Sequence, residues 1–147
     1  MNINAFKAYD IRGEYPRDIN EDLAYQLGLA FVAEYKARTM VVGRDIRESS
    51  PVLFEKLIAG ILDAGCDVIS LGICGTEEVY FKTVFHEADG GIMITASHNP
   101  AEYNGCKILL GESTIYGEQI QDIKRIIDTQ NYFNGPPGSL KSVNIND

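Results

Sequence analysis

Short apolar runs rich in Val, Ile and Leu alternate along this chain with segments of helical periodicity, and no other feature limits the fold as strongly. The strand-like runs fall at residues 39–43, 67–72, 91–95 and 107–110. Helical segments separate the first three runs, and strands joined through helices indicate right-handed crossovers in a largely parallel sheet. The alternation therefore predicts a three-layer α/β/α domain, with helices on both faces of the sheet.

Helix-start and helix-stop residues set the expected bounds of the helices. Asn and Ser are good N-caps, proline suits the first helical turn, and glycine commonly follows the last turn. With these signals, the expected helices run from Asn20 to about Lys36, from Ser50-Pro51 to Gly65, from Thr76 to about His86, and from about Glu118 to Asp128.

The fourth strand-like run, residues 107–110, follows the third after a link that contains no helix. Parallel pairing requires a long crossover, so this strand is expected to run antiparallel. We expect it at the edge of a mixed, mostly parallel sheet of four strands.

The strand–helix pattern stops at Asn131, and residues 134–139 have the Gly, Pro and Ser content of a linker. We expect no further element after this point. The sequence therefore predicts one domain at residues 1–132, followed at residues 133–147 by a linker into a second domain that this sequence does not contain.

The net charge of −8, from 21 acidic and 13 basic residues, argues against a nucleic-acid partner, because clustered Lys and Arg bind phosphate backbones. No signal peptide is visible, nor an apolar segment of about 20 residues, so we expect no membrane partner and a cytoplasmic location. Three cysteines without a C-x-x-C pair and only two histidines favour core thiols in a reducing compartment over a zinc site.

Residues 95–100, Thr-Ala-Ser-His-Asn-Pro, form a small polar loop where the third strand is expected to end. Open α/β sheets bind ligands beyond the carboxyl ends of their strands. A hydroxyl beside an imidazole at that place, Ser97 next to His98, suits a nucleophile or a phosphoryl carrier. A tight loop whose polar residues only make turn hydrogen bonds has the same composition, so the residues alone leave both interpretations open.

The loop resembles the active-site loop of the α-D-phosphohexomutases, and three further segments resemble that family in the same order. They are residues 6–13 (Phe-Lys-Ala-Tyr-Asp-Ile-Arg-Gly), 43–47 (Gly-Arg-Asp-Ile-Arg) and 104–107 (Asn-Gly-Cys-Lys). Residues 75–81 (Gly-Thr-Glu-Glu-Val-Tyr-Phe) are most similar to the bacterial phosphomannomutases of nucleotide-sugar synthesis. The resemblance covers nearly the whole chain and ends in the tail.

This resemblance implies that the parent enzyme interconverts mannose 6-phosphate and mannose 1-phosphate through a hexose 1,6-bisphosphate, which is also the activator. Ser97 would carry the phosphoryl group, and its phosphate would give Mg²⁺ one ligand, with the other ligands outside this chain. The expected partners are the phosphosugar substrate and the remaining domains of the parent mutase. The fragment alone is expected to be inactive.

The resemblance also implies roles for residues around Ser97. Arg12 and Lys107 are expected to neutralise the phosphate and bind the substrate, and Lys107 or His98 to exchange a proton with it. Tyr9 is expected to shape the phosphosugar pocket. The residues expected to support the loop from beneath are Arg44, Asp45, Arg47 and Asn99.

Three other interpretations can be tested. A phosphoglucomutase or phosphoglucosamine mutase shares these motifs, and sugar choice rests on loops outside this chain. A non-catalytic phosphosugar-binding module would keep the fold and tolerate Ser97→Ala in the complete protein. A serine hydrolase is disfavoured, because Ser97 lacks the G-x-S-x-G elbow and its histidine neighbour is adjacent in sequence.

Overall fold

The computed structural model describes residues 5–7, 10–130, 132 and 135–145. Its helices are α1 (Glu21–Tyr35), α2 (Ser50–Asp63), α3 (Thr76–Phe85) and α4 (Glu118–Thr129). Its strands are β1 (Ile11–Glu14), β2 (Thr39–Arg44), β3 (Asp67–Ile73), β4 (Gly90–Ile94), β5 (Tyr103–Leu110), β6 (Ser113–Thr114) and β7 (Leu140–Ser142). All four predicted helices and all four predicted strands are present.

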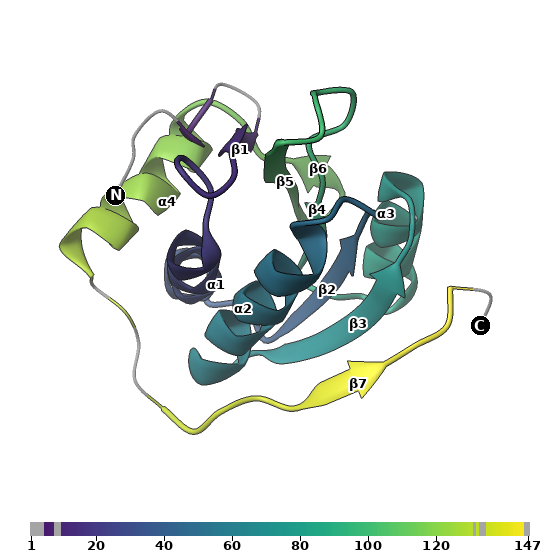
Figure 1. Cartoon of the computed structure of the whole chain (residues 1–147). Coiled ribbons are helices and arrows are strands. Elements are labelled where there is room, and N and C mark those ends of the chain that lie inside the picture. The colour runs from purple at the N-terminus through teal and green to yellow at the C-terminus, as the bar shows by residue number, and fades with distance from the viewer. Residues whose placement is uncertain (1–4, 8–9, 131, 133–134, 146–147) are drawn as a thin grey trace.

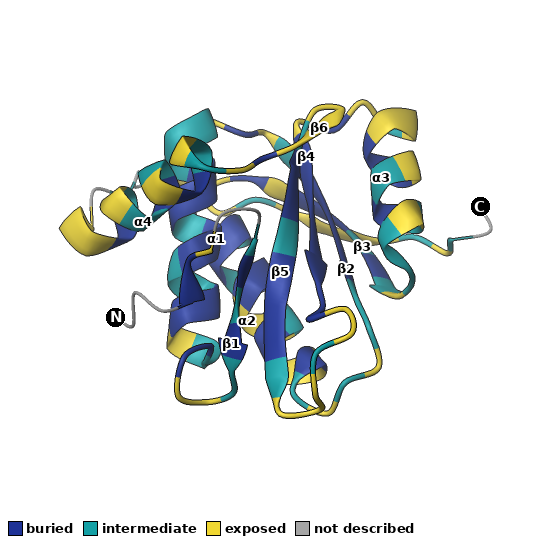
Figure 2. Ribbon diagram, turned by 90° about the horizontal axis from the view of Figure 1, so that it is seen from above, coloured by how far each residue is buried: buried dark blue, intermediate teal, exposed yellow. Residues whose placement is uncertain are grey.

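The sheet lies between two layers of helices, which confirms the predicted α/β/α architecture. Figure 2 shows α1, α2 and α4 on one face of the sheet and α3 on the other. The larger core cluster joins Phe31 of α1, Leu57 of α2 and Ile123 of α4. The smaller cluster places Val79 of α3 against Val41 and other residues of the sheet.

The strand order is β1-β5-β4-β2-β3-β7, with β6 paired to β5 (Figure 1). Strands β4, β2, β3 and β7 are parallel to one another, and β5 runs antiparallel to β4. The antiparallel direction of residues 107–110 is therefore confirmed. Their predicted place at the edge is wrong, because β1 pairs antiparallel to the far side of β5. The prediction of four strands is also wrong, since the described residues form seven.

The helix starts show which capping signals the fold uses. Asn20 caps α1 as predicted, since its side-chain oxygen accepts a hydrogen bond from the Leu23 amide at 2.9 Å. Ser50 is the first residue of α2 rather than its cap, because its hydroxyl bonds Asp45 instead of the helix backbone. Thr76 likewise begins α3, and Gly75 precedes it as the N-cap.

The tail contains one element that the sequence did not predict. Strand β7 pairs parallel to β3, with Leu140 opposite Val68. The Asp67 carboxylate anchors its start by accepting hydrogen bonds from the Ser139 amide at 2.9 Å and hydroxyl at 3.2 Å. All three β7 side chains are exposed, so backbone pairing forms the strand without a hydrophobic pattern. The expectation that no element follows Asn131 is wrong.

The three thiols lie in or near the core, as predicted. Cys66 and Cys106 are buried and Cys74 is half-buried. Burial raises the pKa of Cys66 to about 12 and that of Cys74 to about 11, and it also raises the pKa of Cys106. Within the described part of the chain, no helix combines the length and hydropathy that crossing a bilayer requires.

Helices α1 and α2 approach closely where two glycines face the opposite backbone. A Cβ on Gly60 of α2 would overlap the Tyr25 carbonyl oxygen of α1, and one on Gly28 would lie 2.6 Å from the Leu57 carbonyl oxygen. The two helices can therefore pack backbone to backbone.

We predict that Gly60→Ala destabilises the domain although alanine favours helices. The propensity gain is about 1 kcal/mol. Overpacking costs about 1–3 kcal/mol, and we expect the upper end here, because the atom that the new Cβ would meet is a backbone carbonyl oxygen that cannot rotate away. Urea unfolding should therefore give a lower free energy of unfolding for Gly60→Ala, with the exposed Lys56→Ala on the same helix as control. Equal or greater stability of Gly60→Ala would contradict the close approach.

Candidate active site

Two loops meet at the carboxyl edge of the parallel sheet. Strands β2 and β4 are parallel neighbours with Arg44 opposite Ile94, so the loops that follow them leave the sheet side by side. One loop, residues 45–49, leads into α2, and the other, residues 95–102, leads into β5. The Asp45 amide donates to the Ile94 carbonyl at 3.0 Å, which ties the two loop starts together.

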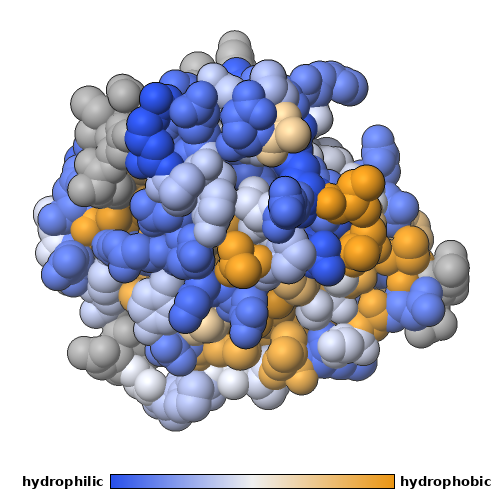
Figure 3. Space-filling view, in the orientation of Figure 1, coloured by the Kyte–Doolittle hydropathy of each residue, from blue (hydrophilic) through white to orange (hydrophobic). Residues whose placement is uncertain are grey.

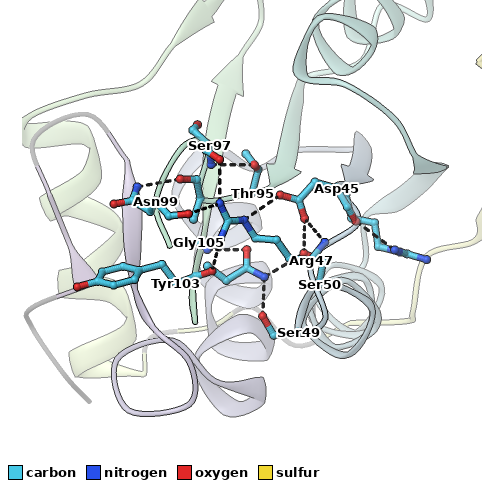
Figure 4. A network of polar contacts seen from close by, with 12 residues as sticks. Asp45, Arg47, Ser49, Ser50, Thr95, Ser97, Asn99, Tyr103 and Gly105 are labelled. Atoms are coloured by element: carbon cyan, nitrogen blue, oxygen red, sulfur yellow. Dashed lines mark hydrogen bonds and ion pairs between the residues drawn. The ribbon is translucent and has the colours of Figure 1, made fainter. Parts of the chain in front are cut away.

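The Arg47 guanidinium binds three carbonyl groups of the second loop and that of Tyr103, the first residue of β5 (Figure 4). Nη1 donates to the carbonyl oxygens of Pro100 at 2.7 Å and Tyr103 at 3.1 Å. Nη2 donates to those of Ser97 at 2.8 Å and Asn99 at 2.7 Å. The Arg47 side chain is only 13% exposed. One side chain from the β2–α2 loop thus fixes the curvature of the whole loop that carries Ser97.

Asp45 orients Arg47 in turn. Its Oδ2 lies 3.3 Å from Arg47 Nε, and its Oδ1 accepts from the Arg47 amide at 3.0 Å. The same Oδ1 accepts from the Ser50 hydroxyl at 2.5 Å. With Nε paired to Asp45 and both Nη groups on carbonyls, all five N–H donors of the guanidinium can be used.

Asn104 closes the network from the start of β5. This residue is fully buried, and its Nδ2 donates to the hydroxyls of Ser49 at 2.8 Å and Ser50 at 2.9 Å. Its Oδ1 accepts from the Gly105 amide at 2.8 Å. The sequence did not predict this network. Ser50 was expected only to cap α2, and Asn104 was singled out only as part of the segment 104–107. The signal that could have pointed to the network is Asn104 itself, a polar residue within the largely apolar β5.

Ser97 itself lies exposed at the turn of the loop. Its φ of 55° is left-handed, a conformation that costs a residue with a Cβ about 1–2 kcal/mol. The Ser97 amide donates to Thr95 Oγ1 at 3.0 Å, and the Asn99 side chain donates to the Ala96 carbonyl at 2.8 Å. Local hydrogen bonds and Arg47 therefore offset the strain. Figure 4 shows the Ser97 side chain pointing away from the network.

The sheet register brings two predicted cations to the same face. Arg12 of β1 lies opposite Gly105, and Lys107 stands two residues further along β5. Side chains two apart on a strand share a face, so Arg12 and Lys107 lie on one side of the sheet. The Arg12 Nε is 3.6 Å from Asp10 Oδ1, while Lys107 is half-buried and pairs with no other described side chain.

The other predicted residues are placed as follows. His98 is exposed and bonds no other described side chain. Arg44 donates to its neighbour's carbonyl, Asp45 O, at 3.1 Å and lies 5.8 Å from the Phe54 ring centroid, so it does not contact the Ser97 loop. Tyr9 lies outside the described residues. Among the residues that the structure describes, no group of three or more His, Cys, Asp and Glu could hold a metal ion.

The family model described as "Phosphoglucomutase/phosphomannomutase, alpha/beta/alpha domain I" matches residues 4–133. The chain belongs to this family.

Family members with solved structures share the fold as well as the sequence. A phosphoglucomutase/phosphomannomutase family protein from Burkholderia thailandensis superposes with a TM-score of 0.91 at 34% identity, over 99% of this chain and 34% of that one. This agreement supports the described sheet order and loop positions.

Curated family members include mutases from several bacteria. Phosphohexose mutases of Xanthomonas campestris are 52% identical over 109 residues, 74% of this chain and 24% of theirs. A phosphomannomutase of Salmonella montevideo is 40% identical over 99% of this chain and 33% of its own length. One from Klebsiella pneumoniae is 42% identical over 97% of this chain and 94% of its own. The chain thus spans a quarter to a third of the first two relatives.

We predict that Arg47→Lys destabilises the domain and loosens the Ser97 loop. Lysine keeps the charge but has three donors on one nitrogen, so several loop carbonyls lose their partner, at an expected cost of about 1–3 kcal/mol. Hydrogen exchange should accelerate at the Asn99 and Tyr103 amides. Arg44→Lys is the matched control and should change neither quantity; equal behaviour of the two variants would contradict the role of Arg47.

Proposed function

We propose that this chain is the phosphoserine-bearing domain of a phosphohexose mutase of the phosphomannomutase type, with Ser97 as the phosphoryl carrier. The observation that supports this most is the loop itself: an exposed hydroxyl, held at the carboxyl edge of the sheet by an arginine that binds four loop carbonyls. Membership of the family supplies the class of reaction.

The proposed chemistry is a phosphoryl exchange between Ser97 and a hexose phosphate. The bond from phosphorus to Ser97 Oγ breaks while a sugar hydroxyl oxygen bonds the phosphorus. The proton of that hydroxyl passes to Lys107 or His98, and the Ser97 oxygen takes up a proton. The resulting hexose 1,6-bisphosphate reorients, and its other phosphate returns to Ser97 by the reverse step, so no group is consumed.

Arg47 positions the serine and does not neutralise its phosphate. Its N–H donors are directed at four carbonyls and at Asp45, which leaves none for a phosphate oxygen. The same bonds turn the negative ends of those carbonyl dipoles toward the guanidinium. Fewer carbonyl oxygens would therefore point at a phosphoserine dianion and repel it.

Arg12 and Lys107 are the residues proposed to meet the phosphate charge. They share the sheet face beside the loop, and phosphoryl transfer depends mainly on alignment and on neutralising the transferring oxygens. Lys107 has no competing partner among the described residues, whereas Arg12 has Asp10 at 3.6 Å. Of the two, Lys107 is the better placed for proton exchange.

Mg²⁺ is the proposed cofactor of the parent enzyme, but the described residues do not form its site. The Ser97 phosphate would give one oxygen ligand, and Mg²⁺ needs near-octahedral coordination. The remaining ligands must come from other parts of the parent protein.

In the complete mutase, Ser97→Ala should lower turnover by about a thousandfold or more, because loss of a covalent carrier removes the reaction path. Peptide mass spectrometry should find phosphate at Ser97 of the unsubstituted enzyme. The exposed Ser113→Ala is the control and should leave both quantities unchanged. Full turnover of Ser97→Ala would overturn the proposed function and favour a binding module.

The 147-residue chain alone should show no steady turnover of mannose 1-phosphate or glucose 1-phosphate with Mg²⁺ and a hexose 1,6-bisphosphate. The metal ligands and the sugar-binding groups of the parent protein are missing from it. A coupled assay of sugar 6-phosphate formation measures this, with the complete mutase as positive control. Sustained turnover by the fragment would contradict the division of roles proposed here.

A further inference from the structure

The outer face of α3 carries large apolar side chains. Phe81, Val84 and Phe85 are 63%, 50% and 59% exposed, and the two phenylalanine rings stack with centroids 5.9 Å apart. Figure 3 shows hydrophobic side chains gathered over α3, on the right of the view. These three residues are named the α3 patch. Scattered exposed apolar residues are ordinary, but a cluster with stacked aromatic rings is typical of an interaction surface.

One polar atom beside Phe85 lacks a partner among the described residues. The buried Nε2 of His86 has no hydrogen-bond partner there, and its ring packs edge-on against Phe85. The Lys82 ammonium lies over the Phe85 ring, 5.1 Å from its centroid. A buried ring nitrogen is normally hydrogen-bonded, so this edge of the patch leaves one polar atom unsatisfied.

The polypeptide after β7 runs beside the same helix. Val143 and Ile145 pack against the cluster that contains Val79 of α3, and Figure 1 shows the last described residues next to α3. This domain corresponds to about one third of the Burkholderia relative, so the other two thirds of such a protein lie outside this domain. The segment that follows this domain in a complete mutase therefore starts within reach of the patch.

We propose that the α3 patch is the docking surface for the part of the parent mutase that follows this domain. The docked surface is apolar, to match the exposed rings of Phe81 and Phe85. A second copy of this chain is a poorer occupant, because two chains of charge −8 repel each other. The inference relies on the proposed function only for the existence of a longer parent chain.

Cysteine labelling tests this without measuring turnover. Val84→Cys places a thiol in the patch, and Val52→Cys, at a valine that is 39% exposed on α2, is the matched control on the other face of the sheet. Peptide mass spectrometry measures the maleimide labelling rate of each thiol, in the 147-residue chain and in the complete mutase. Each rate is then divided by the labelling rate of the same thiol in denaturant. The native thiols are buried or have a raised pKa, so they react slowly.

The two thiols should react at similar rates in the 147-residue chain. In the complete mutase, labelling of the Val84→Cys thiol should slow by about tenfold or more relative to the control position. Equal rates at both positions in the complete mutase would overturn the proposal. Slowing that appears in the 147-residue chain as its concentration rises would also overturn it, since a second copy would then be the occupant. If the complete mutase turned over normally while its Val84→Cys thiol reacted as fast as the control, the docking proposal would be refuted and the proposed function would stand.

Discussion

The contact between the Arg47 guanidinium and four carbonyls of the 97–103 loop is the interaction on which the site depends. A loop that leaves a strand and returns antiparallel has several carbonyl groups that no ladder satisfies, and unpaired buried carbonyls are costly. The planar, permanently charged guanidinium of Arg47 donates hydrogen bonds to four of them at 2.7–3.1 Å. The loop can then hold Ser97 in a left-handed conformation with its hydroxyl in solvent.

The geometry of the sheet makes this contact possible. Parallel pairing of β2 and β4 places the two loops together, and the Asp45 carboxylate aims the guanidinium while binding Ser50 at the first turn of α2. The buried Asn104 then ties Ser50 to β5. Helix α2 in turn packs closely on α1 through Gly60 and Gly28.

The sequence predicted the elements whose side chains carry a pattern. Buried strands such as β2 and amphipathic helices such as α1 were recognisable, and the Thr-Ala-Ser-His-Asn-Pro motif located the site. Strands β1, β6 and β7 were missed. Strands β1 and β6 are only four and two residues long, and every side chain of β7 is exposed, so that strand depends on backbone pairing. Ser50 was wrongly expected to cap α2, because its hydroxyl donates to Asp45 and capping preferences do not predict that hydrogen bond. The hydrogen bonds of Asn104 also join residues far apart in the sequence, so local patterns did not predict them. An arginine beneath the loop, in contrast, was expected from residues 43–47.

In the proposed division of roles, Arg47 shapes the loop while Lys107 and Arg12 receive the phosphate charge. Nitrogen NMR of the complete mutase, labelled in arginine and lysine side chains, can compare the enzyme with and without phosphate on Ser97. The Arg47 guanidinium signals should stay in place while those of Lys107 and Arg12 shift. A large shift at Arg47, with Lys107 and Arg12 unmoved, would refute this division of roles.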